Sequence, residues 1–222
     1  MGANITSMRS EIHVCTLNEE GQLEDTLKSL SSQGPDIVVI DSNSEDGTVD
    51  IASSYAKEVI TVQRGKLVAR DIGMSRTDAD VVMSADAGDI YPDGWADAMM
   101  EPFRNNSNTV AVQGPSYSKE LLWTVKERAH SRLKKHVRLQ GNNSSVRVDA
   151  YEAVGGLDLS VDQQNRRMMI LEEEIRLRRR LSGEGDVVFN PEARCYKSQR
   201  HMILSRDMDM GYVREALSGE RF

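Results

Sequence analysis

The feature that most constrains the fold is an alternation of short apolar segments with amphipathic segments over the first 86 residues. The apolar segments predict strands, and the amphipathic segments predict helices of roughly ten residues between them. The predicted strands span 11–17, 36–41, 58–62 and 80–85, and the predicted helices span 19–32, 49–56 and 65–75. Strands that alternate with helices form right-handed βαβ units, which bring the carboxyl ends of the strands to one edge of a parallel sheet. The sequence therefore predicts an α/β fold with a mainly parallel sheet flanked by helices.

Aspartates end two of these strands. Asp41 closes one apolar segment and Asp86 follows another, with Asp89 three residues later in the same loop. Ligands of α/β proteins bind outside the carboxyl ends of the strands, where carboxylates can hold a metal or a phosphate-bearing ligand. Taken alone, the stretch 79–95 fits a polar turn after a buried strand equally well. Two buried aspartates at one edge favour a binding site, because buried structural aspartates are uncommon.

Local signals predict the remaining elements. Asn18 is expected to be a helix N-cap, since Glu19 and Glu20 would follow it in a first turn that favours acidic groups. Beyond residue 95 the sequence predicts helices at 96–103, 118–140, 167–181 and 208–217, and strands at 110–113 and 186–189. The stretch 118–140 is basic and amphipathic. The solvated face of a packed helix is the simpler interpretation of this stretch, and peripheral contact with a membrane is the alternative.

Composition narrows the class of protein. The chain has 222 residues, of which 39% are hydrophobic and 28% charged, as in soluble globular proteins. Its net charge of −7 argues against a nucleic-acid-binding protein. We expect no membrane span and no signal peptide, and therefore a cytoplasmic protein, with association at the cytoplasmic face of a membrane as the alternative. Cys15 and Cys195 are expected to be free thiols.

Six short motifs follow one another along the chain. They are 16–20 (TLNEE), 39–48 (VIDSNSEDGT), 65–73 (GKLVARDIG), 86–95 (DAGDIYPDGW), 141–147 with 155–158 (GNNSSVR and GGLD), and 171–183. In this order and spacing they resemble the motifs of the family 2 glycosyltransferases, which have the GT-A fold, a Rossmann-like mixed sheet. The resemblance covers about residues 11–200. It implies a single GT-A domain over 1–222, with a nucleotide-sugar-binding half at 1–115, an acceptor-side half at 116–200 and a carboxyl-terminal tail at 201–222.

The resemblance also implies a reaction. A sugar would move from a UDP- or GDP-sugar to an acceptor hydroxyl with inversion, and the acceptor would be a glycan, a lipid-linked molecule or a protein. A divalent ion, Mn²⁺ or Mg²⁺, would neutralise the leaving phosphates, and a carboxylate would act as general base. The implied nucleotide-binding residues are Thr16, Asn18, Glu20, Asp41, Ser42, Arg70 and Asp86. The implied metal ligands are Asp86 and Asp89, and the implied general base is Glu172 or Glu173. The implied acceptor-side residues are Gly141, Asn142, Asn143, Gly155, Gly156 and Asp158. The implied diphosphate-binding residues are Arg200 and His201.

Two departures from the family pattern leave alternatives open. Gly88 stands where the motif has its second aspartate, so the metal would be held by Asp89 instead, held weakly, or replaced by basic side chains. The acidic pair of the last motif reads Leu171-Glu172 in one register and Glu172-Glu173 in the next, and helical spacing does not choose between them. A catalytically inactive GT-A domain that binds nucleotide or glycan is therefore the second hypothesis. A nucleotidyltransferase is disfavoured, because the acidic segment 16–20 is unsuited to a phosphate loop.

Overall fold

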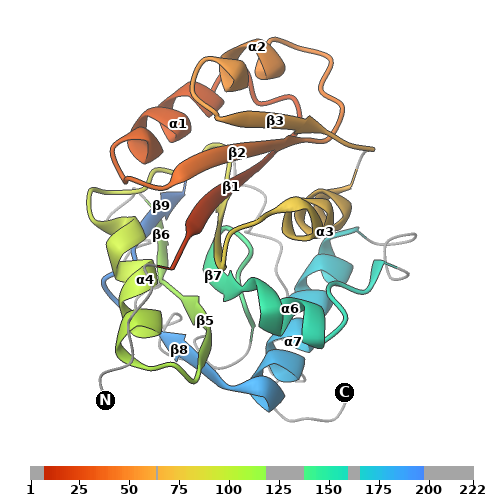
Figure 1. The fold of residues 1–222 in the computed structure, drawn as a ribbon. Helices are drawn as coiled ribbons and strands as arrows, with labels where there is room; N and C mark the ends of the chain where they lie inside the picture. The colour runs from red at the N-terminus through yellow and green to blue at the C-terminus, as the bar shows by residue number, and fades with distance from the viewer. Residues whose placement is uncertain (1–7, 64, 119–137, 160–165, 198–222) are drawn as a thin grey trace.

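The computed structural model describes residues 8–63, 65–118, 138–159 and 166–197 (Figure 1). Its elements are β1 (Ser10–Thr16), α1 (Leu23–Ser31), β2 (Asp36–Asp41), α2 (Thr48–Ser53), β3 (Glu58–Thr61), α3 (Lys66–Arg76), β4 (Val81–Asp86), α4 (Trp95–Asn105), β5 (Thr109–Gln113), β6 (Ser116–Ser118), β7 (Asn143–Arg147), α6 (Val148–Ala153), α7 (Arg166–Glu184), β8 (Asp186–Phe189) and β9 (Cys195–Lys197).

The central feature is a mixed sheet of seven strands in the order β3-β2-β1-β4-β7-β5-β8 (Figure 1). Strands β1 to β4 are parallel to one another where they pair. Strand β7 runs antiparallel between β4 and β5, and β8 lies parallel beside β5 at the far edge. A second, two-stranded sheet pairs β6 with β9. This arrangement confirms the predicted α/β class with a mainly parallel sheet.

Apolar side chains on both faces of the sheet hold the helices. Helices α1, α2 and α4 share a buried cluster with Val39 and Met83 on one face. Helices α3, α6 and α7 pack through two further clusters, which contain the neighbouring strand residues Val38 and Val82. Successive residues of a strand point to opposite faces, so a strand covered on both faces must be apolar throughout. This is why the short continuous apolar segments marked the strands correctly.

Two sequence predictions about local structure were wrong. Asn18 is not a helix N-cap: helix α1 begins at Leu23 with Gln22 as its N-cap, and Asn18 has a left-handed backbone with φ of 52°. Ser118 ends strand β6 and does not begin a helix, and residues 138–140 are not helical. The remainder of the predicted basic helix, 119–137, and the predicted helix 208–217 lie outside the described residues. Strand β7 was not predicted.

Candidate active site

Three strands deliver carboxyl-edge residues to one region of the sheet. Thr16, Asp41 and Asp86 are the last residues of β1, β2 and β4, and the pairing register places Thr16 beside Asp41 and Cys15 beside Asp86. All three terminal side chains are buried. The structure therefore brings the two strand-end aspartates to the same edge, as the sequence predicted.

The loops after β1 and β2 are joined by hydrogen bonds. The Asn18 N–H donates to Ser44 Oγ at 2.8 Å, and the Asn18 side-chain oxygen accepts the Glu45 N–H at 2.9 Å. The Glu20 carboxylate accepts the Gly47 N–H at 2.9 Å. Asn18 and Glu20 thus link the two loops by hydrogen bonds, and both residues are exposed.

Asp41 holds the loop after β2 from its buried side. Its carboxylate is fully buried and accepts the Ser44 N–H at 2.9 Å and the Ser44 hydroxyl at 2.5 Å. The next residue, Ser42, is buried and donates its N–H to the Thr16 carbonyl at 2.9 Å. The structure therefore gathers all five residues predicted in these two loops for nucleotide binding, while giving Asp41 a role in holding the loop.

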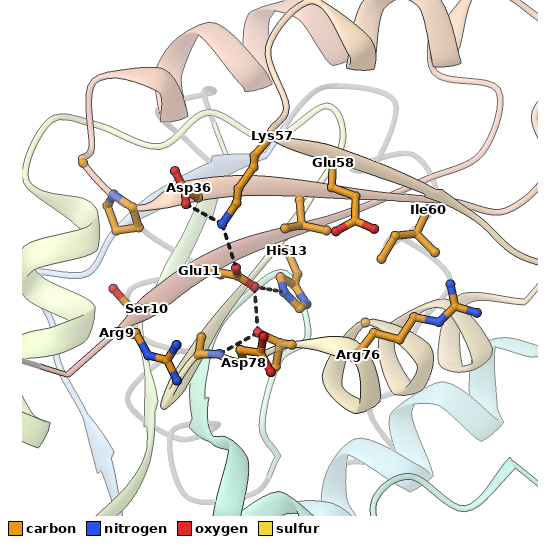
Figure 2. A pocket seen from close by; sticks show the side chains of 16 residues that line it. Arg9, Ser10, Glu11, His13, Asp36, Lys57, Glu58, Ile60, Arg76 and Asp78 are labelled. Atoms are coloured by element: carbon orange, nitrogen blue, oxygen red, sulfur yellow. Dashed lines mark hydrogen bonds and ion pairs between the residues drawn. The ribbon is translucent and has the colours of Figure 1, made fainter.

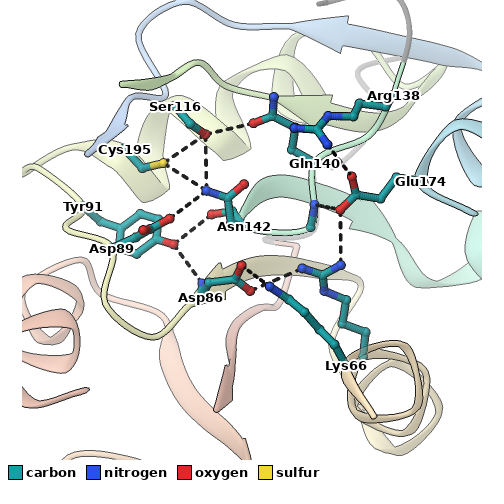
Figure 3. A network of polar contacts seen from close by, with 12 residues as sticks. Lys66, Asp86, Asp89, Tyr91, Ser116, Arg138, Gln140, Asn142, Glu174 and Cys195 are labelled. Atoms are coloured by element: carbon teal, nitrogen blue, oxygen red, sulfur yellow. Dashed lines mark hydrogen bonds and ion pairs between the residues drawn. The ribbon is translucent and has the colours of Figure 1, made fainter. Parts of the chain in front are cut away.

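Asp86 forms ion pairs with two basic residues of helix α3, Lys66 and Arg70 (Lys66 is labelled in Figure 3). Lys66 Nζ is 2.5 Å from Asp86 Oδ2, and Arg70 Nη2 is 3.3 Å from Asp86 Oδ1. Burial alone would lower the pKa of Arg70, but the nearby carboxylates of Asp86 and Glu174 raise it. Beside them, desolvation raises the pKa of the Cys15 thiol to about 11, so this thiol stays protonated at neutral pH. The edge of β4 therefore carries one carboxylate and two basic side chains.

Helix α7 presents three consecutive glutamates to three different environments. Glu172 is partly exposed and pairs with Arg176 at 2.6 Å, one turn along the same helix. Glu173 is fully buried, where it accepts from Arg180 at 2.5 Å and from the Asp158 N–H at 2.9 Å. These two are the glutamates that the sequence proposed as the base, and neither contacts the cations at Asp86.

Glu174 is the glutamate that reaches the Asp86 region (Figure 3). Its Oε1 accepts the Gly141 N–H at 3.0 Å and lies 3.3 Å from Arg70 Nη1, while its Oε2 lies 3.3 Å from Arg138. Arg70 therefore bridges Glu174 of helix α7 and Asp86 of strand β4. Glu174, Arg138 and Lys66 were not predicted as site residues from the sequence.

The approach of Arg70 depends on Gly141. A Cβ atom at residue 141 would lie 1.9 Å from Arg70 Cζ and 2.0 and 2.2 Å from its two terminal nitrogens. The guanidinium group thus occupies the volume that any other side chain would need. Gly141 was predicted as an acceptor-side residue, and the structure places its backbone against both Arg70 and Glu174.

A buried polar network fixes the loop after β4 (Figure 3). Asp89 is fully buried and accepts from Asn142 Nδ2 at 2.7 Å. The Tyr91 hydroxyl accepts the Asp86 N–H at 2.9 Å and donates to the Asn142 carbonyl at 2.8 Å. Asn142 also lies 3.3 Å from the hydroxyl of Ser116. This network joins the loop after β4 to the segment that the sequence assigned to the acceptor side.

The other predicted acceptor-side residues are divided between two places. Asn143 is fully buried in β7, where its side chain accepts from Trp95 Nε1 at 2.7 Å. Gly155, Gly156 and Asp158 follow α6 instead, and the Asp158 N–H donates to Glu173. Tyr91 and Trp95 are buried in the core. Arg200 and His201 lie outside the described residues.

The described carboxylates at this edge do not by themselves form a site for a divalent ion. Mn²⁺ and Mg²⁺ need several oxygen ligands around one point, whereas Asp89 is turned to Asn142 and Asp86 is held by Lys66 and Arg70. Nowhere in 8–63, 65–118, 138–159 or 166–197 do three His, Cys, Asp or Glu side chains gather as a metal site. At Gly88 the backbone has φ of +88°, a conformation that favours glycine over the aspartate of the family motif.

A cavity of about 530 Å³ lies at the opposite edge of the sheet, where the parallel strands begin (Figure 2). Glu11 projects into it between His13 and Lys57, and Lys57 also pairs with Asp36 at 2.8 Å. The hydrogen bond from His13 is the main reason that the pKa of Glu11 falls to about 2. None of the residues predicted for the active site lines this cavity.

The sheet order and the charged carboxyl edge define a GT-A-type α/β domain, and comparisons with known proteins agree. The family model for Glycosyl transferase family 2 matches residues 11–154. The chain therefore belongs to glycosyl transferase family 2. Within the described residues, no helix is long and apolar enough to cross a membrane.

The chain is similar in sequence to two enzymes of named activity. The glucosyl-dolichyl phosphate glucuronosyltransferase of Haloferax volcanii is 22% identical over 245 aligned residues, which cover 95% of this chain and 77% of the relative. The poly-beta-1,6-N-acetyl-D-glucosamine synthase of Staphylococcus epidermidis is 32% identical over 106 residues, which cover 44% of this chain and 26% of the synthase.

Solved structures show the same fold. A mannosyltransferase from Pyrobaculum calidifontis, in complex with GDP-Man and Mn²⁺, superposes with a TM-score of 0.64 at 18% identity, covering 86% of this chain and 57% of that protein. A glucosyl-3-phosphoglycerate synthase from Mycobacterium tuberculosis, in complex with Mn²⁺, UDP and phosphoglyceric acid, gives 0.59 at 18% identity, covering 83% and 69%. This chain thus spans little more than half the length of the mannosyltransferase.

Proposed function

We propose that this protein transfers a sugar from a UDP- or GDP-sugar to an acceptor hydroxyl, with inversion at the anomeric carbon. The observation that supports the proposal is the linked arrangement of Asp86, Arg70 and Glu174 at the carboxyl edge of β4. In this proposal the donor binds to the half formed by residues 1–115, against Asp86 and the exposed residues Asn18 and Glu20. The acceptor lies toward residues 116–200.

Glu174 is the carboxylate best placed to act as general base. In an inverting transfer the base accepts the proton of the acceptor hydroxyl, while that oxygen bonds to C1 of the sugar. The bond between C1 and the phosphate oxygen breaks, and its electron pair leaves with the nucleoside diphosphate. Glu174 is 8% exposed and faces the donor edge through Arg70, whereas Glu173 is sealed against Arg180 and Glu172 lies one turn from Arg176. This geometry favours Glu174 over the two glutamates that the sequence proposed.

The acceptor is proposed to be lipid-linked, among the three classes considered. The support is the name of the Haloferax volcanii relative, whose acceptor is a glucosyl-dolichyl phosphate. Such an acceptor would place the protein at the cytoplasmic face of a membrane. Contact through residues 118–140 remains part of this proposal, since 119–137 lie outside the described residues.

The test is release of nucleoside diphosphate from a panel of UDP- and GDP-sugars, with water or added acceptors. We expect Glu174→Gln to lower the rate by about 10²–10⁴-fold, as loss of a general base does, with the affinity for nucleotide retained. Glu172→Gln and Glu173→Gln are measured beside it, and Glu101→Gln, an exposed residue of α4, is the charge-matched control.

Each outcome decides between the hypotheses. A loss of rate in Glu172→Gln or Glu173→Gln, with Glu174→Gln fully active, would contradict the assignment of the base. Nucleotide binding with no turnover of any donor, with or without acceptors, would favour the inactive, ligand-binding domain that the change at Gly88 suggested.

A further inference from the structure

We propose that Lys66 and Arg70 supply the positive charge that neutralises the donor diphosphate, so that nucleotide binding requires no divalent ion. The inference rests on the proposed function and deepens it, because it names the groups that recognise the phosphates. It departs from the sequence expectation of Mn²⁺ or Mg²⁺ held by Asp86 and Asp89.

The two cations come from one face of α3. Residues four apart on a helix lie above one another, so Lys66 and Arg70 point to the same spot. They reach different oxygens of Asp86, at 2.5 and 3.3 Å (Figure 3). The Lys66 side chain is 38% exposed and that of Arg70 is 10% exposed. A ligand arriving from solvent therefore meets the ammonium group first and finds the guanidinium group behind it.

The chemistry of these two groups suits a diphosphate. A guanidinium group can donate two parallel hydrogen bonds to phosphate oxygens, and an ammonium group acts as a compact point charge. The Arg70 position is fixed by Glu174 and by the close approach to Gly141, so its charge is held in place before the ligand arrives. Charges placed in advance stabilise the negative charge that develops on the leaving phosphate oxygen as the C1–oxygen bond breaks.

Lys66 and Arg70 would also oppose the binding of a divalent ion to Asp86. It would have to displace Lys66 from the carboxylate oxygen or remain close to two positive charges, and like charges at such separations repel strongly. The second carboxylate of the loop offers no help in this conformation, because Asp89 is fully buried against Asn142. The Gly88 N–H also donates to the Thr26 hydroxyl at 2.9 Å, which holds this turn in its present conformation.

The experiment measures what the second phosphate contributes to binding. UDP and UMP, and separately GDP and GMP, are titrated calorimetrically into the full chain in EDTA and again in Mn²⁺. The ratio of the diphosphate to the monophosphate affinity isolates the β-phosphate from the base and ribose. We expect a ratio of roughly tenfold or more in EDTA, because a charge-assisted contact is added, and little change on adding Mn²⁺.

Lys66→Gln is the test variant and Lys57→Gln the matched control. Both substitutions remove one ammonium group that pairs with an aspartate, but Lys57 lies at the amino edge of the sheet against Asp36 (Figure 2). We expect Lys66→Gln to lower the ratio in EDTA several-fold with the monophosphate affinity unchanged, because Arg70 remains, and Lys57→Gln to leave both values as in the wild type.

Three results would overturn the inference. Diphosphate binding that appears only with Mn²⁺ would contradict it and leave the proposed function intact. An unchanged ratio in Lys66→Gln would also contradict it. Failure of both diphosphates to bind in either buffer would overturn this inference together with the proposed function.

Discussion

The substitution Gly141→Ala tests the close approach of Arg70 to the backbone of residue 141. On backbone grounds alone this change should be harmless or stabilising by about 0.4–1 kcal/mol, because alanine restricts the unfolded chain and residue 141 does not have a positive φ. The structure predicts the opposite sign, since the new Cβ would lie 1.9 Å from the Arg70 guanidinium carbon.

The magnitude follows from what Arg70 must give up. To avoid the methyl group, the guanidinium has to leave its contacts with Asp86 and Glu174, each at 3.3 Å. Hydrogen bonds to charged groups contribute about 1.5–3 kcal/mol each, and separating the partners of a buried ion pair costs about 3–5 kcal/mol. After the backbone gain is subtracted, we expect a loss of about 3 kcal/mol in the free energy of unfolding. For a chain of this length the melting temperature should fall by about 6–12 °C.

The assay is urea unfolding of four proteins that form a double-mutant cycle: the wild type, Gly141→Ala, Arg70→Ala and the double variant. In the Arg70→Ala background the clash is gone, so Gly141→Ala should cost nothing there. Gly183→Ala is the control for the glycine-to-alanine change. It lies in helix α7 with no atom within 4 Å of its Cβ position, and it should stabilise by up to about 1 kcal/mol. A cost of Gly141→Ala that persists in the absence of Arg70 would refute the reasoning.

Three further predictions concern stability. Gly88→Ala should destabilise by about 1 kcal/mol, measured by urea unfolding, because φ of +88° strains any residue with a Cβ. Tyr91→Phe should cost about 1–3 kcal/mol in the same assay and weaken hydrogen-exchange protection of the Asp86 amide, since that buried N–H loses its acceptor. Glu11→Gln should matter only above acidic pH: the hydrogen bond from His13 lowers the folded pKa of Glu11 to about 2 from 4.5, so the stability it contributes is present above pH 4.5 and is lost as the pH falls toward 2. Unfolding curves of wild type and Glu11→Gln from pH 7 down to pH 2 should therefore converge, and a constant gap would contradict this cause.

Much of the parallel half of the sheet was predictable from the sequence. Strands β2 and β4 are covered on both faces, so they are short continuous apolar segments. Such segments are typical of parallel strands when amphipathic helices lie between them in the chain. The placement of Asp41 and Asp86 at one edge followed from the parallel strand direction that βαβ units impose.

Strand β7 escaped prediction because its buried residues are polar. Asn143, Ser144 and Ser145 are all buried, yet they show neither apolar alternation nor an apolar run. Their polar atoms are satisfied by distant partners: Asn143 donates to the carbonyls of Pro115 and Ala193, both at 2.9 Å. Those partners are set by the tertiary structure, so a local pattern could not reveal them.

The sequence predicted Glu172 or Glu173 as the base, whereas Glu174 is the glutamate of α7 that contacts Arg70. The predicted register of the motif ends at Gly183, but Gly185 is the glycine that the fold requires, since a Cβ there would lie 2.4 Å from the Asn108 carbonyl oxygen. A register that ends at Gly185 moves the acidic pair to Glu173 and Glu174. Gly185 was therefore the signal in the sequence that pointed to this alternative register.

The insertion of β7 between β4 and β5 has a consequence for how the chain folds during synthesis. The ribosome releases β4 and β5 well before β7, and neither can pair with the other, because their shared neighbour has not yet been made. Until residue 147 emerges, the hydrogen-bonding edges of both strands stay open to water, to chaperones or to another chain. Pairing between segments so far apart in sequence is also slow, because a long loop must close first. We therefore expect nascent chains that end before β7 to be prone to aggregation, and those that include it to become compact.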